Sequence, residues 1–146
     1  MAPMPTSPEW LPAVPAVSVL VVDDDEDTRN STVALLNAFG VRARAARDGE
    51  EALQLLPEVQ PELILCDLQM PRLDGFGFVK RLRRTRPFHR ILTVAVTGLA
   101  GPIDTAATRE AGFDGHLVKP ISPAMIARLL DRAVLARLQD RPPQGA

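Results

Sequence analysis

Four aspartates stand at the ends of two runs of β-forming residues. Asp23, Asp24 and Asp25 come directly after one run, and Asp67 ends another. If the two runs are neighbours in one parallel sheet, the carboxylates of Asp23, Asp24 and Asp67 meet at a common edge. Three carboxylates stay charged at close range only when a cation joins them. Oxygen ligands with water in the remaining positions favour Mg²⁺, and one carboxylate could then attack phosphorus.

The elements that must position these aspartates alternate between strand and helix. We expect strands over 17–22, 41–45, 62–66, 91–96 and 115–118. We expect helices from 25 to about 39, 48 to 56, 74 to about 82, 103 to 111 and 123 to 138, with Pro57 ending the second. Five strand–helix units in this order predict an α/β fold with an open, doubly wound parallel sheet.

Length and composition indicate one folded domain with two tails. The chain has 146 residues, of which 46% are hydrophobic, and its net charge of −1 creates no overall field that favours nucleic acid or an anionic membrane. We expect the folded domain over 17–139. Residues 1–16 hold five prolines and predict a flexible tail, in which Trp10 is the one large anchor. Residues 140–146 predict a short second tail.

The sequence favours a cytoplasmic protein. No apolar stretch approaches the ~20 residues that a membrane helix needs, and the N-terminus has no basic segment typical of a signal peptide. The only cysteine, Cys66, excludes an internal disulfide framework. Its place inside a hydrophobic run predicts a buried and unreactive thiol.

In a doubly wound sheet, ligands bind beyond the carboxyl ends of the strands, where the strand order reverses. The chemically informative residues all fall at such ends: Asp23 and Asp24 after the first expected strand, then Asp67, Thr97 and Lys119 after the third, fourth and fifth. Each has an ordinary explanation as a cap, turn or loop residue. Their joint occurrence at matching strand ends favours a site.

Four short segments carry a resemblance to a known family. They are Val-Val-Asp23-Asp24-Asp25-Glu26-Asp27, Cys-Asp67-Leu-Gln-Met70-Pro71-Arg-Leu-Asp74-Gly75, Val-Thr97-Gly98 and Val-Lys119-Pro120. In this order they resemble the receiver domain of two-component response regulators over about residues 17–138. The stretch 111–120 is especially similar to receivers attached to hybrid sensor kinases. The resemblance implies a flavodoxin-like fold with strand order 2-1-3-4-5 and five helices.

The resemblance also implies a role for each site residue. Asp67 would accept a phosphoryl group from a histidine phosphate. Asp24 and Asp67 would bind Mg²⁺ directly with the backbone carbonyl of Gln69, and Asp23 would help through water. Lys119 and Thr97 would each contact a phosphoryl oxygen. This agrees with the physics of phosphoryl transfer, which needs in-line positioning and neutralised charge more than covalent chemistry.

Further family features concern the neighbours of these residues. Gly98 would leave room for the phosphodonor, and a cis bond would precede Pro120. Thr97 and His116 would form the conformational switch, although the family usually has Tyr or Phe at the position of His116. Gln69 and Leu99 occupy the two positions that commonly tune attack by water.

The resemblance implies partners as well. We expect a histidine kinase or a histidine phosphotransfer protein as phosphodonor. We expect a downstream protein partner on the face formed by the fourth helix, fifth strand and fifth helix, and the sequence leaves a homodimer open. The chain ends after the fifth expected helix, so we expect no output domain in it. We also expect no enzymatic activity beyond its own phosphorylation and dephosphorylation.

Two other metal-dependent chemistries share part of the acidic motif. The spacing of Asp23, Asp25 and Asp27 mimics the start of an EF-hand loop, but that loop needs Gly at its sixth position and Glu at its twelfth, where this chain has Thr28 and Ala34. A haloacid-dehalogenase-type phosphatase would use Asp23 as nucleophile and Asp25 as acid. That interpretation leaves the 70–71 and 74–75 motifs unexplained and lacks room for a cap domain.

A basic stretch raises the question of nucleic acid. It consists of Lys80, Arg81, Arg83, Arg84, Arg86 and Arg90. Most such runs are solvated faces, and the chain shows no helix-turn-helix or other DNA-reading motif. We therefore expect no nucleic-acid partner and no membrane partner.

Overall fold

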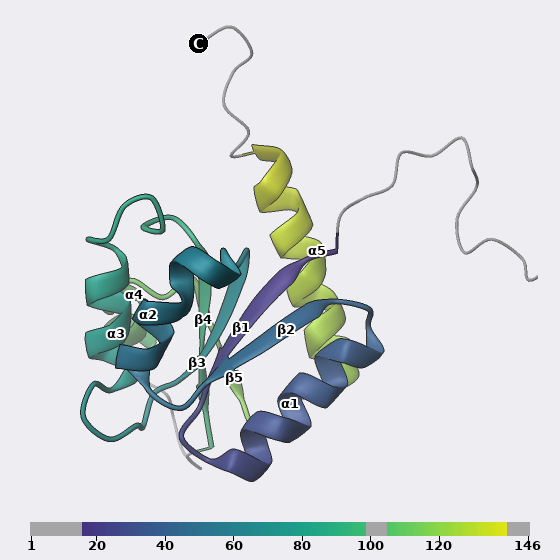
Figure 1. Cartoon of the computed structure of the whole chain (residues 1–146), viewed down its shortest axis with the longest axis horizontal. Coiled ribbons are helices and arrows are strands. Elements are labelled where there is room, and N and C mark those ends of the chain that lie inside the picture. Colours follow the sequence, from purple (N-terminus) through teal and green to yellow (C-terminus); the bar gives the residue numbers. More distant parts are fainter. Residues whose placement is uncertain (1–15, 99–104, 140–146) are drawn as a thin grey trace, which may run out of the picture.

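The structure, a computed structural model, describes residues 16–98 and 105–139. Strands and helices alternate strictly within it (Figure 1). The elements in chain order are β1 (Ser18–Val22), α1 (Glu26–Ala38), β2 (Arg42–Ala46), α2 (Gly49–Val59), β3 (Leu63–Asp67), α3 (Gly75–Leu82), β4 (Leu92–Thr97), α4 (Thr105–Ala111), β5 (Gly115–Val118) and α5 (Pro123–Gln139).

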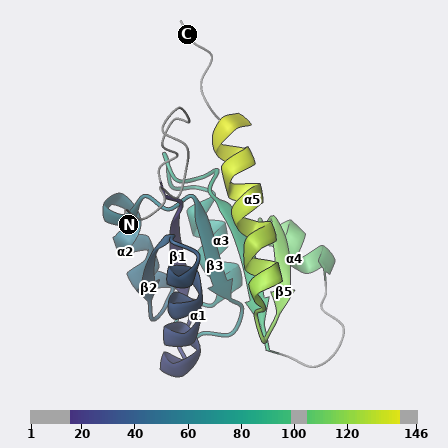
Figure 2. The ribbon, with the colours of Figure 1, turned by 90° about the vertical axis from the view of Figure 1, so that its right-hand side faces the viewer.

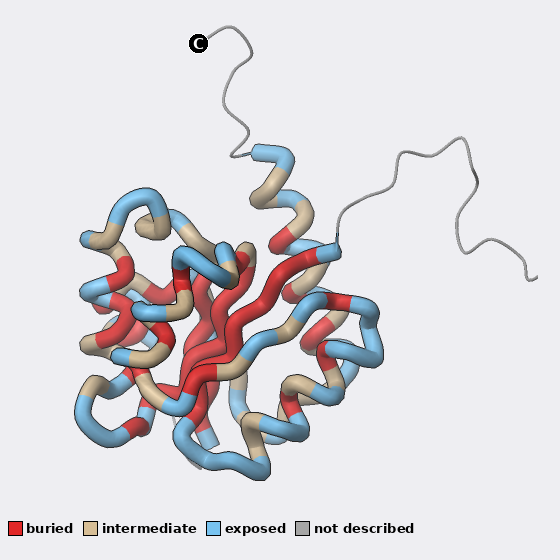
Figure 3. Tube along the Cα trace, viewed as in Figure 1, coloured by how far each residue is buried: buried red, intermediate tan, exposed pale blue. Residues whose placement is uncertain are grey.

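The five strands form one parallel sheet in the order β2-β1-β3-β4-β5, which confirms the predicted topology. The strand order reverses at β1, whose neighbours are β2 and β3. Every residue of β1 and of β3 is buried, as expected for central strands that are covered on both faces. Figure 3 shows this buried centre running through the middle of the molecule.

Helices cover both faces of the sheet (Figure 2). On one face, α1 and α5 pack through Leu36, Ile126 and Leu129 against alternate residues of β1, β3 and β4. On the other face, the helices α2, α3 and α4 pack against the intervening residues, with Leu56 and Phe78 fully buried. The alternation of side chains along each strand thus divides the core into two layers.

Three aspartates begin the helices on the edge where the strands end. Asp25, Asp48 and Asp74 precede α1, α2 and α3, and each accepts a hydrogen bond from the backbone N–H three residues later. Such capping satisfies backbone donors that the helix itself leaves free. These three aspartates therefore cap helices, a structural role that Asp23, Asp24 and Asp67 do not share.

Some boundaries differ from the prediction. The helix α2 continues past Pro57 to Val59, because a proline in the last turn removes only one helical hydrogen bond while Leu56 remains buried. The strands β3 and β4 each extend one residue further and include Asp67 and Thr97, since the ladder between them continues to the pair of Asp67 with Val96.

Several predictions fall on residues that the structure does not describe. They include the start of the fourth helix at Ile103, the role of Leu99, and both tails with Trp10. Among the described residues, none of the helices combines the length and the apolar character needed to cross a membrane.

Candidate functional site

Three carboxylates meet at the carboxyl edge of the sheet. β1 and β3 are neighbours with Val22 opposite Cys66, so the residues that follow, Asp23 and Asp67, emerge side by side. One ligand atom each of Asp23, Asp24 and Asp67 lies within 4.8 Å of the others. Asp23 and Asp67 are buried, whereas Asp24 is exposed. The convergence predicted from the sequence is confirmed.

Backbone donors fix the orientation of the two buried carboxylates. The N–H of Asp25 donates to Oδ1 of Asp23 at 2.9 Å, and the N–H of Gln69 donates to Oδ1 of Asp67 at 3.0 Å. A hydrogen bond from the residue two positions along holds one oxygen of each carboxylate and leaves Oδ2 directed elsewhere.

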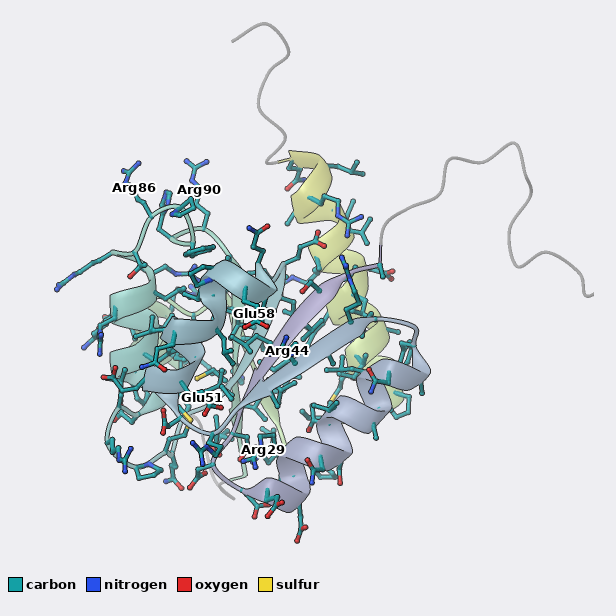
Figure 4. All side chains as sticks on the ribbon, viewed as in Figure 1. Arg29, Arg44, Glu51, Glu58, Arg86 and Arg90 are labelled. Carbon is teal, nitrogen blue, oxygen red and sulfur yellow. The ribbon has the colours of Figure 1, made fainter. Side chains whose placement is uncertain are left out.

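An arginine that was not predicted from the sequence also stabilises the backbone at this edge of the sheet. Arg29, one turn into α1, donates from Nη1 to the backbone carbonyl of Asp23 at 2.9 Å (Figure 4). No pattern in the sequence announces this bond, because it depends on the path of the chain between β1 and α1.

Lys119 faces both buried carboxylates. Its Nζ lies 2.9 Å from Oδ2 of Asp23 and 3.5 Å from Oδ2 of Asp67. Burial alone would lower the pKa of the ammonium, but the hydrogen bond to Asp23 and the charges of Asp67 and Asp23 outweigh it and raise that pKa above 10.5. Lys119 is therefore a permanent cation of the site at neutral pH.

The carboxyl of Asp67 is harder to ionise than an ordinary one. Burial raises its pKa from 3.8, and the bond from Gln69 and the charge of Lys119 compensate only in part. The lysine lies nearer to Asp23, and the negative charge of Asp23 itself opposes ionisation of Asp67. The site thus holds more negative charge than its one ammonium neutralises.

This arrangement fits a hard divalent cation. Carboxylate oxygens are the ligands that Mg²⁺ prefers, and the exposed Asp24 gives the group an open side. A backbone carbonyl in the loop after β3 is a suitable additional ligand, and Gln69 lies in that loop as an exposed residue. We expect Asp24, Asp67 and the Gln69 carbonyl to hold the ion.

A glycine allows α3 to begin directly against the end of β3. A Cβ at Gly75 would lie 2.5 Å from the carbonyl oxygen of Asp67 and 2.9 Å from Cα of Leu68, which are impossible contacts for a real atom. The N–H of Gly75 instead donates to the carbonyl of Leu68 at 3.2 Å. The Asp74-Gly75 motif thus combines a helix cap with a close approach of two backbones.

Thr97 and Lys119 reach the same edge from β4 and β5. Thr97 is 2% exposed, and its carbonyl accepts from the N–H of Lys119 at 2.8 Å. The Lys119–Pro120 peptide is cis, as the resemblance implied. A Cβ at Gly98 would lie 3.6 Å from Cδ of Lys119, an ordinary contact, so Lys119 alone does not demand glycine there.

The proposed switch residue His116 lies on the surface. It is exposed on β5 opposite Ala95, while its neighbour Leu117 packs into the layer under α1 and α5. Val118, two residues on, is 43% exposed. His116 therefore occupies the outer position in this state, and its movement on phosphorylation stays a prediction.

The phosphatase alternative does not fit the geometry. Asp25 caps α1 by accepting from the N–H of Thr28 at 3.0 Å and from the Thr28 hydroxyl. These bonds from Thr28 lower the pKa of Asp25 and favour its ionised form, which is unsuited to a proton donor. Asp23 is also the carboxylate that lies nearer to the Lys119 ammonium, at 2.9 Å against 3.5 Å for Asp67.

Cys66 is buried, as predicted, and its low reactivity stays a prediction. It is fully buried and free, and burial, followed by the charges of Asp67 and Asp23, raises its pKa well above 9.0.

Comparison with known proteins points to one family. The model of the response regulator receiver domain matches residues 19–131. A gliding motility regulatory protein of Myxococcus xanthus is 38% identical over 83% of this chain, and the transcriptional regulatory protein AfsQ1 of Streptomyces coelicolor is 37% identical over 82%. The chain spans only 16% and 52%, respectively, of these two relatives.

Solved structures agree with the sequence relatives. The chemotaxis protein CheY4 of Vibrio cholerae superposes with a TM-score of 0.75 at 29% identity, covering 82% of this chain and 99% of that one. The Francisella response regulator 1452 receiver domain gives a TM-score of 0.69 at 27% identity, covering 84% and 98%.

Proposed function

Since the chain belongs to the response regulator receiver family of two-component systems, we propose that it accepts a phosphoryl group on Asp67. The observation that carries this proposal is the convergence of Asp67 with Asp23, Asp24 and Lys119 at one edge of the sheet. Among the three carboxylates, Asp67 is the one held by Gln69 on one oxygen, with its second oxygen 3.5 Å from the ammonium.

The step is a displacement at phosphorus. A bond forms between Oδ of Asp67 and the phosphorus atom while the phosphorus–nitrogen bond to the donor imidazole breaks, and that nitrogen keeps the electron pair and takes up a proton. Lys119 supplies positive charge to the transferred group, and the Thr97 hydroxyl contacts one of its oxygens. Bound Mg²⁺ would neutralise the remaining oxygens. Burial keeps the acceptor in fixed orientation.

We propose that the chain catalyses only its own phosphorylation and dephosphorylation. The phosphodonor is a histidine kinase or a histidine phosphotransfer protein, and the downstream partner binds the face of α4, β5 and α5, where His116 and Val118 are exposed. A cytoplasmic location stays a prediction.

The direct test is labelling with a small-molecule phosphodonor. With Mg²⁺ and a phosphoramidate, intact-mass spectrometry should show the gain of a single base-labile phosphoryl group, and Asp67→Asn should abolish it. Asp131→Asn, which changes an exposed residue of α5, serves as the matched control and should label normally. Labelling of Asp67→Asn at the wild-type rate would refute the assignment.

A further inference from the structure

The segment between Asp74 and Asp104 contains six cationic residues and no acidic one. Two of the six are engaged in the fold. Arg81 pairs with Glu50 at 2.6 Å, and Arg83 pairs with Asp114 at 2.9 Å. The other four are Lys80, Arg84, Arg86 and Arg90, which we call the basic patch. All four are exposed, and none of their side chains forms an ion pair or hydrogen bond with the part of the chain that the structure describes.

The surface around α2 differs from this patch. Four surface arginines there are each within 4.0 Å of a carboxylate: Arg44 of Glu58, Arg47 of Glu51, Arg72 of Asp48 and Arg81 of Glu50. The four exposed cations of the basic patch have no such carboxylate partner among the described residues, and uncompensated like charges produce a positive local potential.

The basic patch lies away from the phosphoacceptor. Figure 4 shows Arg86 and Arg90 together above the end of α3, pointing outward from the loop that leads to β4, while Arg29 of the acceptor edge lies at the opposite end. The loop adjoins the starts of the strands, whereas Asp67 stands at the end of β3. A ligand on the basic patch would thus leave Asp67 accessible.

A groove runs beside this loop. Its volume is about 300 Å³, and Pro87 and Ile91 of the loop face Ala133 and Ala136 of α5 across it. Arg90 is among its lining residues. The groove is largely apolar and large enough for one aliphatic or aromatic side chain.

The one carboxylate in the groove is already neutralised. Glu62 accepts from Nε and Nη2 of Arg137, each at 2.5 Å. This bidentate pair removes the charge that would repel an acidic ligand. The net charge of the residues that line the groove is therefore the positive charge of Arg90.

We propose that the α3–β4 loop is a docking site for an acidic segment of a partner protein that carries one apolar side chain. Carboxylates of that segment bind Arg86 and Arg90, and the apolar side chain enters the groove between the loop and α5. Guanidinium groups suit carboxylates because their planar donors bind both oxygens. Nucleic acid fits less well, since Arg86 and Arg90 lie on one short loop and the chain shows no DNA-reading motif.

A labelled peptide of glutamates and serines around a single leucine tests the site. Fluorescence anisotropy with the full chain should show saturable binding that weakens with salt. Changing the glutamates to glutamines, or the leucine to serine, should weaken it. The double change Arg86→Gln/Arg90→Gln should lower affinity by about fivefold or more, since each exposed pair contributes modestly. Ala136→Leu, which fills the groove, should lower it independently.

Two controls separate this docking site from the acceptor site. Arg109→Gln/Arg128→Gln removes the same charge from exposed positions on α4 and α5 and should leave peptide binding unchanged. Phosphoramidate labelling of the Arg86→Gln/Arg90→Gln variant should also proceed at the wild-type rate. The test of docking is therefore independent of the test of the phosphoacceptor role.

Three results would overturn the proposal. The first is equal loss of binding in both double variants, which would mean a general charge effect. The second is equal binding of the glutamine peptide, or no saturable binding at all. The third is tighter binding of a labelled DNA duplex than of the peptide with the same dependence on Arg86 and Arg90, which would assign the basic patch to nucleic acid.

Discussion

The Lys119 ammonium donates its shorter hydrogen bond to Asp23, at 2.9 Å, rather than to Asp67, at 3.5 Å. The strongest ion pair of the site therefore joins the lysine to a carboxylate that is not the proposed acceptor. When a phosphoryl group is bound to Asp67, the same ammonium has a nearby anion to which it can turn. Lys119 thus links Asp23, after β1, with the proposed acceptor Asp67 at the end of β3.

Replacing this lysine should strengthen metal binding. Lys119→Met removes the cation that competes with Mg²⁺ for Asp23 and Asp67, so we expect Mg²⁺ affinity to rise several-fold while phosphorylation slows. The metal-free chain should lose stability, because a lysine whose pKa is raised on folding stabilises the fold at every pH below its unfolded value of 10.5. Mg²⁺ titration followed by NMR measures the affinity, with Lys80→Met as control. Weaker Mg²⁺ binding in Lys119→Met would contradict this role.

The raised pKa of Asp67 predicts a pH-dependent cost in stability. The folded state holds the Asp67 proton more tightly than the unfolded state, so the cost of ionisation is absent below 3.8, grows as the pH rises from 3.8, and is complete above the raised pKa. Without metal, Asp67→Asn should therefore be more stable than the wild type at pH 7, and the difference should close towards pH 3.8. Urea unfolding across this range, with Asp131→Asn as control, measures it. An Asp67→Asn variant less stable at pH 7 would show that the pair with Lys119 dominates.

Gly75 should tolerate no side chain. In Gly75→Ala the new methyl would meet the backbone of Asp67 and Leu68, which cannot move aside, so we expect a loss of about 1–3 kcal/mol in the free energy of unfolding. Gly77→Ala in the same helix would meet no backbone atom at close range: its one close contact is the Cδ1 atom of Leu73, at 2.7 Å, which is the flexible end of a side chain. Chemical denaturation should show a clearly smaller effect for Gly77→Ala. Equal losses of stability in the two variants would mean that helix propensity, and not the contact with the backbone of Asp67 and Leu68, determines the effect of the substitution.

Arg83 should be a structural residue although it lies in a basic run. Its guanidinium donates to the carbonyls of Gly112 at 2.7 Å and Ile91 at 2.7 Å and to the carboxylate of Asp114 at 2.9 Å. We expect Arg83→Ala to cost about 2 kcal/mol or more, since partly buried carbonyls lose their donor. The neighbouring Arg84→Ala should stay within about 0.5 kcal/mol of the wild type. Similar unfolding midpoints for the two variants would contradict this division.

The sequence predicted most of the site because each motif is local and ends a strand. Asp23 and Asp67 could be placed side by side once their runs were assigned to adjacent parallel strands, and the register of Val22 with Cys66 bears this out. The extension of β3 to include Asp67 was missed, since strand ends depend on partner strands and not on composition.

Contacts between segments that are distant in the chain could not be predicted from the sequence. The bond from Arg29 to the Asp23 carbonyl depends on how the chain turns after β1. The separation of Arg83 from Arg84 depends on which side of the turn after α3 faces Gly112 and Asp114, 29 and 31 residues away from Arg83. The sequence alone does not distinguish the members of this basic run. Packing does, because Arg83 is bonded to Gly112 and Asp114 whereas the side chain of Arg84 is not.

Chemical mapping of the phosphorylated residue tests the central claim most directly. The chain is labelled with phosphoramidate and Mg²⁺, reduced with borohydride, which converts an aspartyl phosphate to homoserine, and digested for sequencing by mass spectrometry. We expect homoserine at position 67 and unchanged aspartate at positions 23 and 24. Homoserine at position 23 would contradict the proposed function and would instead favour the phosphatase alternative, in which Asp23 is the nucleophile.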